Sequence, residues 1–179
     1  NMVEWPQVPG AAPNYQKMAL KQGDPLTKPG IVGAFCRAYD IRTAMDKFLP
    51  GIYTPCIMGS EERYTYTGGS TAGGAIIYDN GKFLYSHHAT DPCSMQLVNA
   101  FDLVRLHLYG DKDDSAPGNT PVSKLPSYKA MCEMAMQDSA VQAIYNKEQF
   151  AQLQADFGAI APIPGSGPQQ TPGGSDGAE

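Results

Sequence analysis

The stretch AIIYDNGKFLYSHHATDP at residues 75–92, followed by NAFDLVR at residues 99–105, decides the fold. Two runs rich in β-branched and aromatic residues, 75–78 and 83–85, flank the triplet Asp79-Asn80-Gly81. An Asn-Gly step suits the positive φ angles of a tight hairpin turn. Because both runs are almost continuously apolar, we expect both faces of the hairpin to be covered. The sequence therefore predicts an antiparallel hairpin at about 74–87.

A helix is predicted shortly after this hairpin. Asn99 can cap its first turn, and Asp102 three residues later favours the positive end of the helix dipole. Phe101, Val104 and Leu108 then share one face. Gly110 follows at the usual stopping place of a helix.

The remaining pattern divides the chain of 179 residues into an ordered middle and two looser ends. One domain is the usual expectation for this length. We expect an extended arm or linker at 1–28, a single domain at 29–158 and a disordered linker or tail at 159–179. Within the domain the pattern predicts a helical hairpin at 29–49, and Asp40 can cap the second of its two helices. A sheet and a helix are predicted at 63–110, and C-terminal helices at 126–157. The predicted fold class is α+β, with a small antiparallel sheet and surrounding helices.

The cysteines are scattered singly along the chain, at Cys36, Cys56, Cys93 and Cys132. Without Cys-x-x-Cys or Cys-x-x-His spacing, the sequence predicts no cysteine-based metal site. No apolar run approaches the roughly 18 residues of a membrane span, and the N-terminus lacks the basic and apolar leader of a secretory signal. We therefore expect reduced cysteines, a cytoplasmic location and no membrane partner.

Chemically capable side chains gather in and after the turn that follows the hairpin, namely His87, His88, Asp91 and Asp102. Neighbouring strand residues point to opposite faces, so one histidine can face a site while the other packs. In a structural interpretation, Asp91-Pro92 forms a turn in which Asp91 accepts backbone hydrogen bonds. The alternatives are direct contact with nucleic acid, and a metal site or His-Asp general-base pair. The residues alone leave these alternatives open.

A loop rich in Gly, Ser and Thr precedes the hairpin at residues 67–74. Such a loop can present backbone amides to a phosphate. However, no Lys-Ser/Thr follows, and a hairpin rather than a helix comes next, which excludes a nucleotide-binding P-loop. The preferred interpretation is a connection between strands.

The net charge of −5 argues against a grip on nucleic acid by the whole surface. Residues 1–50 hold six basic and four acidic residues (+2), and the remainder holds seven and fourteen (−7). If DNA is bound, we expect cations to contact the backbone and tyrosines to stack on bases. The candidate residues are Arg37, Arg42, Lys47, Arg63 and Lys82, with Tyr64, Tyr66 and Tyr85.

The order of these motifs resembles that of a known family. GIVGAFCRAY at 30–39, RYTY at 63–66, STAGG at 70–74, the histidine turn at 85–92 and the helix start at 99–105 resemble a region of phage and prophage primase-helicases of the virulence-associated protein E type. The resemblance runs from about residue 5 to about residue 157. In that family the region lies between an N-terminal primase-polymerase module and a C-terminal helicase-type ATPase. The resemblance therefore implies a protein of the bacterial host cell with those two modules as partners.

The same resemblance limits what activity is implied. The acidic motifs of the polymerase and the Gly-Lys-Ser/Thr loop of the ATPase are both missing from this chain. It therefore implies no catalytic residue and no cofactor here. A more distant similarity connects strand, loop, hairpin, histidine turn and helix to the zinc-ribbon DNA-binding domain of bacterial primases, where a loop before the hairpin and a turn after it supply the ligands. Because the loop here lacks ligands, that similarity implies a zinc-ribbon-like core whose metal site has degenerated.

The expected function is a non-catalytic DNA-template-binding or spacer domain of a phage replication primase-helicase, with single- or double-stranded DNA as a partner. One alternative is a protein–protein adaptor within the same replication protein. The other is a metal-dependent nuclease or phosphotransferase that uses the His-His-Asp turn.

Overall fold

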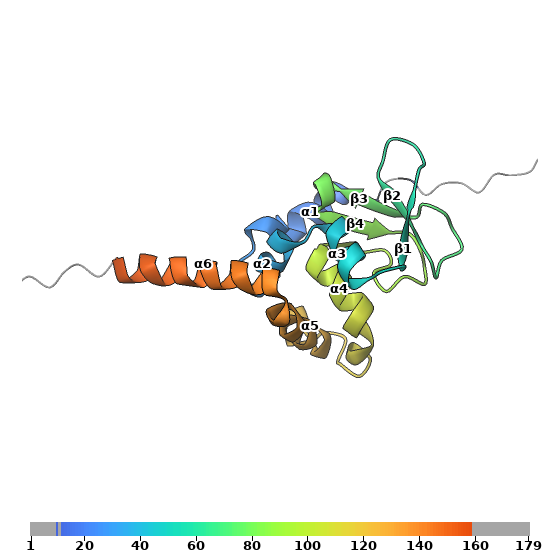
Figure 1. The fold of residues 1–179 in the computed structure, drawn as a ribbon. Coiled ribbons are helices and arrows are strands. Elements are labelled where there is room, and N and C mark those ends of the chain that lie inside the picture. The colour runs from blue at the N-terminus through green and yellow to red at the C-terminus, as the bar shows by residue number, and fades with distance from the viewer. Residues whose placement is uncertain (1–9, 11, 159–179) are drawn as a thin grey trace, which may run out of the picture.

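A meander of five antiparallel strands lies beside a group of helices in the computed structural model, which describes residue 10 and residues 12–158 (Figure 1). The strands pair in chain order. The strands are β1 Tyr53–Cys56, β2 Arg63–Tyr66, β3 Ala75–Tyr78, β4 Phe83–Ser86 and β5 Leu97–Val98. The described α-helices are α1 Tyr15–Gln22, α2 Gly30–Ala38, α3 Ile41–Phe48, α4 Ala100–Tyr109, α5 Pro126–Gln137 and α6 Ser139–Gly158. This architecture confirms the predicted α+β class, with a small sheet and surrounding helices.

The predicted hairpin is present as β3 and β4, which pair from Ala75 with Ser86 to Tyr78 with Phe83. Its connection has four residues, 79–82, and contains the predicted triplet Asp79-Asn80-Gly81. Positive φ angles occur at Asp79 (47°), Asn80 (51°) and Gly81 (91°). The turn lies against the start of α3, since an added Cβ at Gly81 would lie 2.8 Å from Oδ2 of the N-cap residue Asp40 and 2.7 Å from an Arg42 guanidinium nitrogen.

Both faces of the hairpin are covered, as its apolar composition predicts. Leu84 faces the main core, where it packs in one cluster with Phe101 and Leu103 of α4. Phe83 and Tyr85 face the other way and pack with β5 and the N-terminal segment. Alternate strand residues point to opposite faces, and here each face has its own apolar cover.

The cover on the second face is α1, in the segment where the sequence predicts an extended arm at 1–28. The Tyr15 ring stacks on Tyr78 with centroids 4.4 Å apart, and Gln22 Nε2 donates to Leu97 O at 2.7 Å. Tyr15, Met18 and Ala19 pack on the cluster with the spacing of one helical face. Tertiary contact therefore holds a helix whose own sequence gives only a weak signal. Residues 1–9 and 11 of the predicted arm lie outside the described residues.

Two predicted helix starts are confirmed by their caps. Asp40 Oδ1 accepts a hydrogen bond from Thr43 N at 2.8 Å, and Asn99 Oδ1 accepts one from Asp102 N at 2.9 Å. Each cap satisfies an amide that has no partner within its helix. One residue of α4 differs from the expected pattern, because Leu108 is 41% exposed and the neighbouring His107 turns toward β1 instead.

The C-terminal helices α5 and α6 are separated by Asp138 alone. Its carboxylate accepts hydrogen bonds from the Ala140 and Val141 amides at 3.0 and 3.1 Å and contacts Lys47 Nζ at 2.6 Å. Asp138 thus caps α6 and ties its start to α3. The predicted tail at 159–179 lies outside the described residues. No helix within residues 12–158 combines the length and the apolar character needed to cross a membrane.

Candidate functional site

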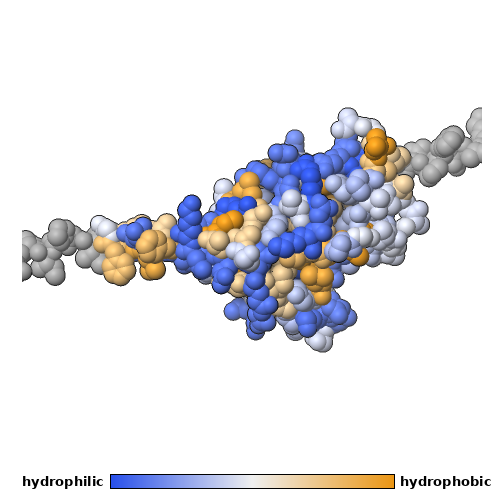
Figure 2. All heavy atoms as spheres, viewed as in Figure 1, coloured by the Kyte–Doolittle hydropathy of each residue, from blue (hydrophilic) through white to orange (hydrophobic). Residues whose placement is uncertain are grey.

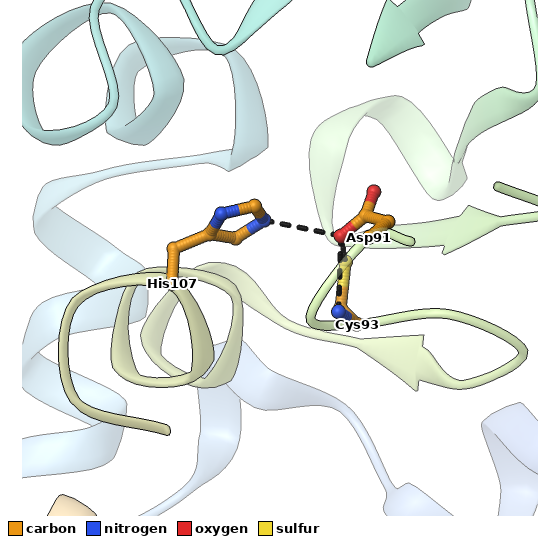
Figure 3. A group of neighbouring side chains, drawn as sticks. All are labelled: Asp91, Cys93 and His107. Carbon is orange, nitrogen blue, oxygen red and sulfur yellow. Dashed lines mark hydrogen bonds and ion pairs between the residues drawn. The ribbon is translucent and has the colours of Figure 1, made fainter. Parts of the chain in front are cut away.

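Four polar side chains meet in the interior where β1, the turn after β4 and α4 come together. Asp91 Oδ1 lies 2.9 Å from Cys93 Sγ and 3.2 Å from His107 Nε2 (Figure 3). The Tyr53 hydroxyl donates to Asp91 Oδ2 at 2.7 Å, lies 2.8 Å from His107 Nε2 and lies 3.4 Å from Cys93 Sγ. We call these four residues the Asp91 cluster. It joins the first strand of the sheet to the helix that packs beneath it.

Local sequence explains how Asp91 and Cys93 come together. Pro92 follows Asp91 in a tight turn, so the carboxylate also accepts the Cys93 backbone amide at 3.0 Å, in the Asx-turn arrangement. His107 arrives from α4, one turn after the buried Leu103. The Asp91 side chain has no exposed surface and that of His107 has 5%. The Asp91 carboxylate is therefore out of reach of a substrate in this structure.

The ionisation of the cluster follows from burial and hydrogen bonding. Burial raises the pKa of the Cys93 thiol well above its ordinary value, so the thiol keeps its proton and donates to Asp91. Burial likewise raises the pKa of the Tyr53 hydroxyl. Burial alone would raise the pKa of Asp91, but the hydrogen bonds from His107, Cys93 and Tyr53 outweigh it and hold that pKa well below its usual range. Asp91 is therefore an ionised carboxylate in the interior.

The structure brings only one of the four residues singled out in the histidine turn and in α4 into this cluster. His88 Nε2 accepts the Tyr66 amide at 3.2 Å, away from Asp91, and the His87 ring packs against Tyr85. Asp102 lies at the start of α4 and pairs with Arg105 at 2.9 Å. A metal site or general-base pair made of all four residues is therefore not assembled here.

The Gly-rich loop closes over His88 and does not open as a phosphate cradle. An added Cβ would lie 2.5 Å from His88 Nδ1 at Gly69 and 2.8 Å from His88 Nε2 at Gly74. Glycine is thus required because the loop backbone packs directly on a buried imidazole. Burial lowers the pKa of His88, so that the ring stays neutral and can accept the Tyr66 amide. The loop before the hairpin and the turn after it do contact each other, as the zinc-ribbon similarity implies. The contact consists of loop glycines packed on the His88 ring.

Each of the five cations proposed to contact DNA forms an ion pair with a carboxylate of this chain. The pairs are Arg37 with Glu148 (2.5 Å), Arg42 with Glu62 (2.5 Å) and Asp40 (3.0 Å), Lys47 with Asp138 (2.6 Å), Lys82 with Asp24 (2.8 Å), and Arg63 with Glu61. Arg63 is also buried, and it donates to Gly73 O at 3.1 Å. These positive charges are therefore locally compensated.

The three tyrosines proposed to stack on bases lie on the sheet in different surroundings. Tyr85 is buried against α1 and β5. Tyr66 is half-buried among Tyr53, His88 and His107. Tyr64 is half-buried and donates to Glu62 at 3.3 Å. Because strand residues two apart share a face, Tyr64 and Tyr66 lie on one side of β2, and Tyr85 belongs to the apolar layer on the opposite face of the sheet.

Two members of the Asp91 cluster, Tyr53 and His107, were not among the candidate residues, and Cys93 entered only as one of four scattered cysteines. Tyr53 precedes the predicted sheet, which begins at residue 63. One feature of the sequence indicates that His107 faces the interior. It lies four residues after Leu103 and therefore on the same face of the helix.

A second feature is the outer half of α6. Glu148 is held to α2 by its ion pair with Arg37, and every residue from 149 to 158 is exposed. This part of the helix projects from the rest of the molecule (Figure 1), and Figure 2 shows apolar surface on it. Phe150, Leu153 and Phe157 are 62%, 53% and 69% exposed. We call these three residues the α6 stripe.

Comparison of this chain with protein-family models, curated proteins and solved structures found no match.

Proposed function

We propose that this chain is a non-catalytic protein–protein adaptor that pairs through the α6 stripe with α6 of a second copy. The observation that carries the proposal is the exposure of two phenylalanines and a leucine at positions i, i+3 and i+7 of a projecting helix. This is the spacing of a coiled-coil seam, in which such side chains fit between those of a facing helix. Large apolar side chains gathered on an uncovered surface mark an interaction site.

The residues beside the stripe support a second copy as the occupant. In heptad register, Phe150 and Phe157 take position a and Leu153 takes position d. The flanking e and g positions are then Gln149, Gln154 and Asp156. Glutamine amides can both donate and accept hydrogen bonds, so two identical helices meet no opposed row of like charges. Self-pairing is thus compatible with the charge pattern.

The resemblance to primase-helicases gives this adaptor a proposed setting. In that setting the domain would be a spacer between a primase-polymerase module and a helicase module in the bacterial cytoplasm, and pairing of α6 would bring copies of the replication protein together. The motifs at 30–39, 63–74, 85–92 and 99–105 support this assignment. The closed Asp91 cluster supports a role without catalysis, because no substrate can reach its carboxylate.

Pairing predicts a concentration-dependent mass. Sedimentation equilibrium of the full chain of 19.2 kDa should show conversion from monomer to dimer in the micromolar range. Leu153→Lys should weaken this association by at least about 100-fold, because the dimer would lose two buried leucines that are each worth roughly 1.5–3 kcal/mol.

The matched control for this experiment is Ala155→Lys, which adds the same charge on the opposite side of the same exposed segment. It should leave association unchanged. A wild-type chain that stays monomeric up to about 100 µM would overturn the proposal, and so would equal weakening by both lysines. Far-ultraviolet circular dichroism of each variant checks that the helix content is retained.

For DNA the same structure predicts weak or no binding. Exposed ion pairs are each worth only about 0–1 kcal/mol, so breaking them is inexpensive. However, every proposed cation has a carboxylate beside it, which cancels the local positive potential that attracts phosphates. Fluorescence anisotropy with labelled single-stranded and duplex DNA should show no binding at roughly 50 mM salt. Affinity that falls linearly in log–log plots against salt would contradict this expectation and support template binding.

A further inference from the structure

We propose that the Asp91 cluster binds one zinc ion through Asp91 Oδ1, Cys93 Sγ and His107 Nε2, with the Tyr53 hydroxyl at the fourth position. The first three atoms all lie within 4.8 Å of one another, and they belong to the three side-chain types that bind zinc most often. This site is distinct from the α6 stripe and does not depend on the proposed pairing.

The spacing of the ligand atoms suits a tetrahedral ion. Zinc binds nitrogen, oxygen and sulfur at 2.0–2.3 Å, which places tetrahedral ligands roughly 3.3–3.7 Å apart. The separations here are 2.9 Å between Oδ1 and Sγ, 3.2 Å between Oδ1 and Nε2, and 2.8 and 3.4 Å from the Tyr53 hydroxyl to Nε2 and Sγ. Most of these separations are shorter than the tetrahedral spacing by a few tenths of an ångström, so the ligands would have to move apart by that amount to admit the ion.

The charge of the loaded site would also balance. A zinc ion with the Asp91 carboxylate, a Cys93 thiolate, a neutral imidazole and a neutral phenol has a net charge of zero. The Asp91 side chain has no exposed surface, so a neutral site adds no uncompensated charge to the interior.

The protons balance in this step. Zinc displaces the Cys93 thiol proton, which passes to solvent, and a zinc–sulfur bond forms. His107 binds through the lone pair of Nε2, so the proton that Nε2 donates to Asp91 before the ion binds moves to Nδ1 of the same ring. With a neutral imidazole, an ionised Asp91 and a protonated Tyr53, the Cys93 proton is the one released for each ion bound.

The surroundings indicate a structural ion and exclude an open catalytic one. Closed sites with four protein ligands are typical of structural zinc, whereas catalytic zinc keeps one position for water. Here the ligands come from β1, from the turn after β4 and from α4, so the ion would fasten the edge of the sheet to the helix beneath it. The individual positions of the cysteines in the sequence gave no sign of such a site.

The test uses the full chain, reconstituted with zinc under reducing conditions and freed of unbound metal. Elemental analysis should find about one zinc per chain. Replacement of zinc by cobalt should give a thiolate-to-cobalt charge-transfer band in the near ultraviolet. Cys93→Ser should lose that band and most of the bound metal. Cys132→Ser, which alters a half-buried cysteine of α5, should retain both.

A second variant keeps the proposal testable if Cys93→Ser fails to fold. His107→Gln keeps the thiolate and should weaken zinc binding by at least 100-fold in a competition titration with a chelator. Failure of the wild-type chain to hold zinc after reconstitution would overturn the proposal. A cobalt band that survives Cys93→Ser would also overturn it, because another cysteine would then supply the ligand.

Discussion

Gly33→Ala should lower the free energy of unfolding by about 3 kcal/mol, the upper end of the cost of inserting a methyl group into a packed site. An added Cβ at Gly33 would lie 1.6 Å from the carbonyl oxygen of Lys28 and 2.6 Å from its carbon. These are backbone atoms, which cannot turn aside as a side chain can. The segment before α2 would have to lift from the helix.

The surroundings of Gly33 resist that movement. The Arg37 guanidinium donates to Lys28 O at 3.0 Å and to Leu26 O at 2.7 Å, so it holds the same segment down on α2. Helix propensity alone predicts the opposite sign, because alanine favours a helix interior over glycine by about 1 kcal/mol. The sign of the change therefore separates close packing from propensity.

Urea denaturation followed by circular dichroism measures the effect of Gly33→Ala. Gly158→Ala is the matched control, because Gly158 is also helical and an added Cβ there meets nothing within 4 Å. The control should be neutral or slightly stabilising. If Gly33→Ala proved as stable as the wild type, the close approach of Lys28 to α2 would be wrong.

Gly74→Ala should destabilise the protein by about 2 kcal/mol, again through overpacking. The new Cβ would lie 2.8, 2.9 and 3.1 Å from three atoms of the His88 ring. That ring is buried, and its Nε2 accepts the Tyr66 amide, so it has little room to move away. The φ angle of Gly74 is not positive, and the cost is therefore steric and not conformational.

A double-mutant cycle with His88→Ala isolates this contact. His88→Ala alone should also destabilise the protein, since it leaves a cavity and an amide without its acceptor. In that background Gly74→Ala should cost almost nothing, which gives a coupling of about 1–2 kcal/mol. Equal costs in both backgrounds would show that the ring is not the cause. Gly118→Ala, at a loop position where an added Cβ meets nothing within 4 Å, serves as the control.

Local signals in the sequence were sufficient for much of the fold. The β3–β4 hairpin and the caps at Asp40 and Asn99 depend on residues within a few positions of one another, and the structure contains all three. The contact that this turn makes was not predictable in the same way. Gly81 lies against the side chains of Asp40 and Arg42 at the start of α3, some forty residues earlier in the chain.

Features set by distant contacts could not be read from the sequence. Helix α1 exists against β5 and Tyr78, and its own residues gave no clear pattern. The glycines of residues 67–74 suggested a flexible connection, but the requirement for Gly69 and Gly74 arises from His88 beyond the hairpin. The Asp91 cluster likewise draws Tyr53 and His107 from 54 positions apart. Periodicity correctly indicated a helix through Phe150, Leu153 and Phe157, but it could not tell whether anything covers that face.

The single-residue link at Asp138 has a mechanical consequence for any assembly that α6 forms. Its carboxylate binds both the first amides of α6 and Lys47 of α3, so the base of the helix is tied to the rest of the domain. A second fastening, from Arg37 to Glu148, lies about halfway along. A 20-residue helix is about 30 Å long. Because α6 is fastened at its base and near its middle, we expect its projecting half to move together with the domain. If two chains paired through the outer halves of α6, the length of the two helices would set the distance between their domains.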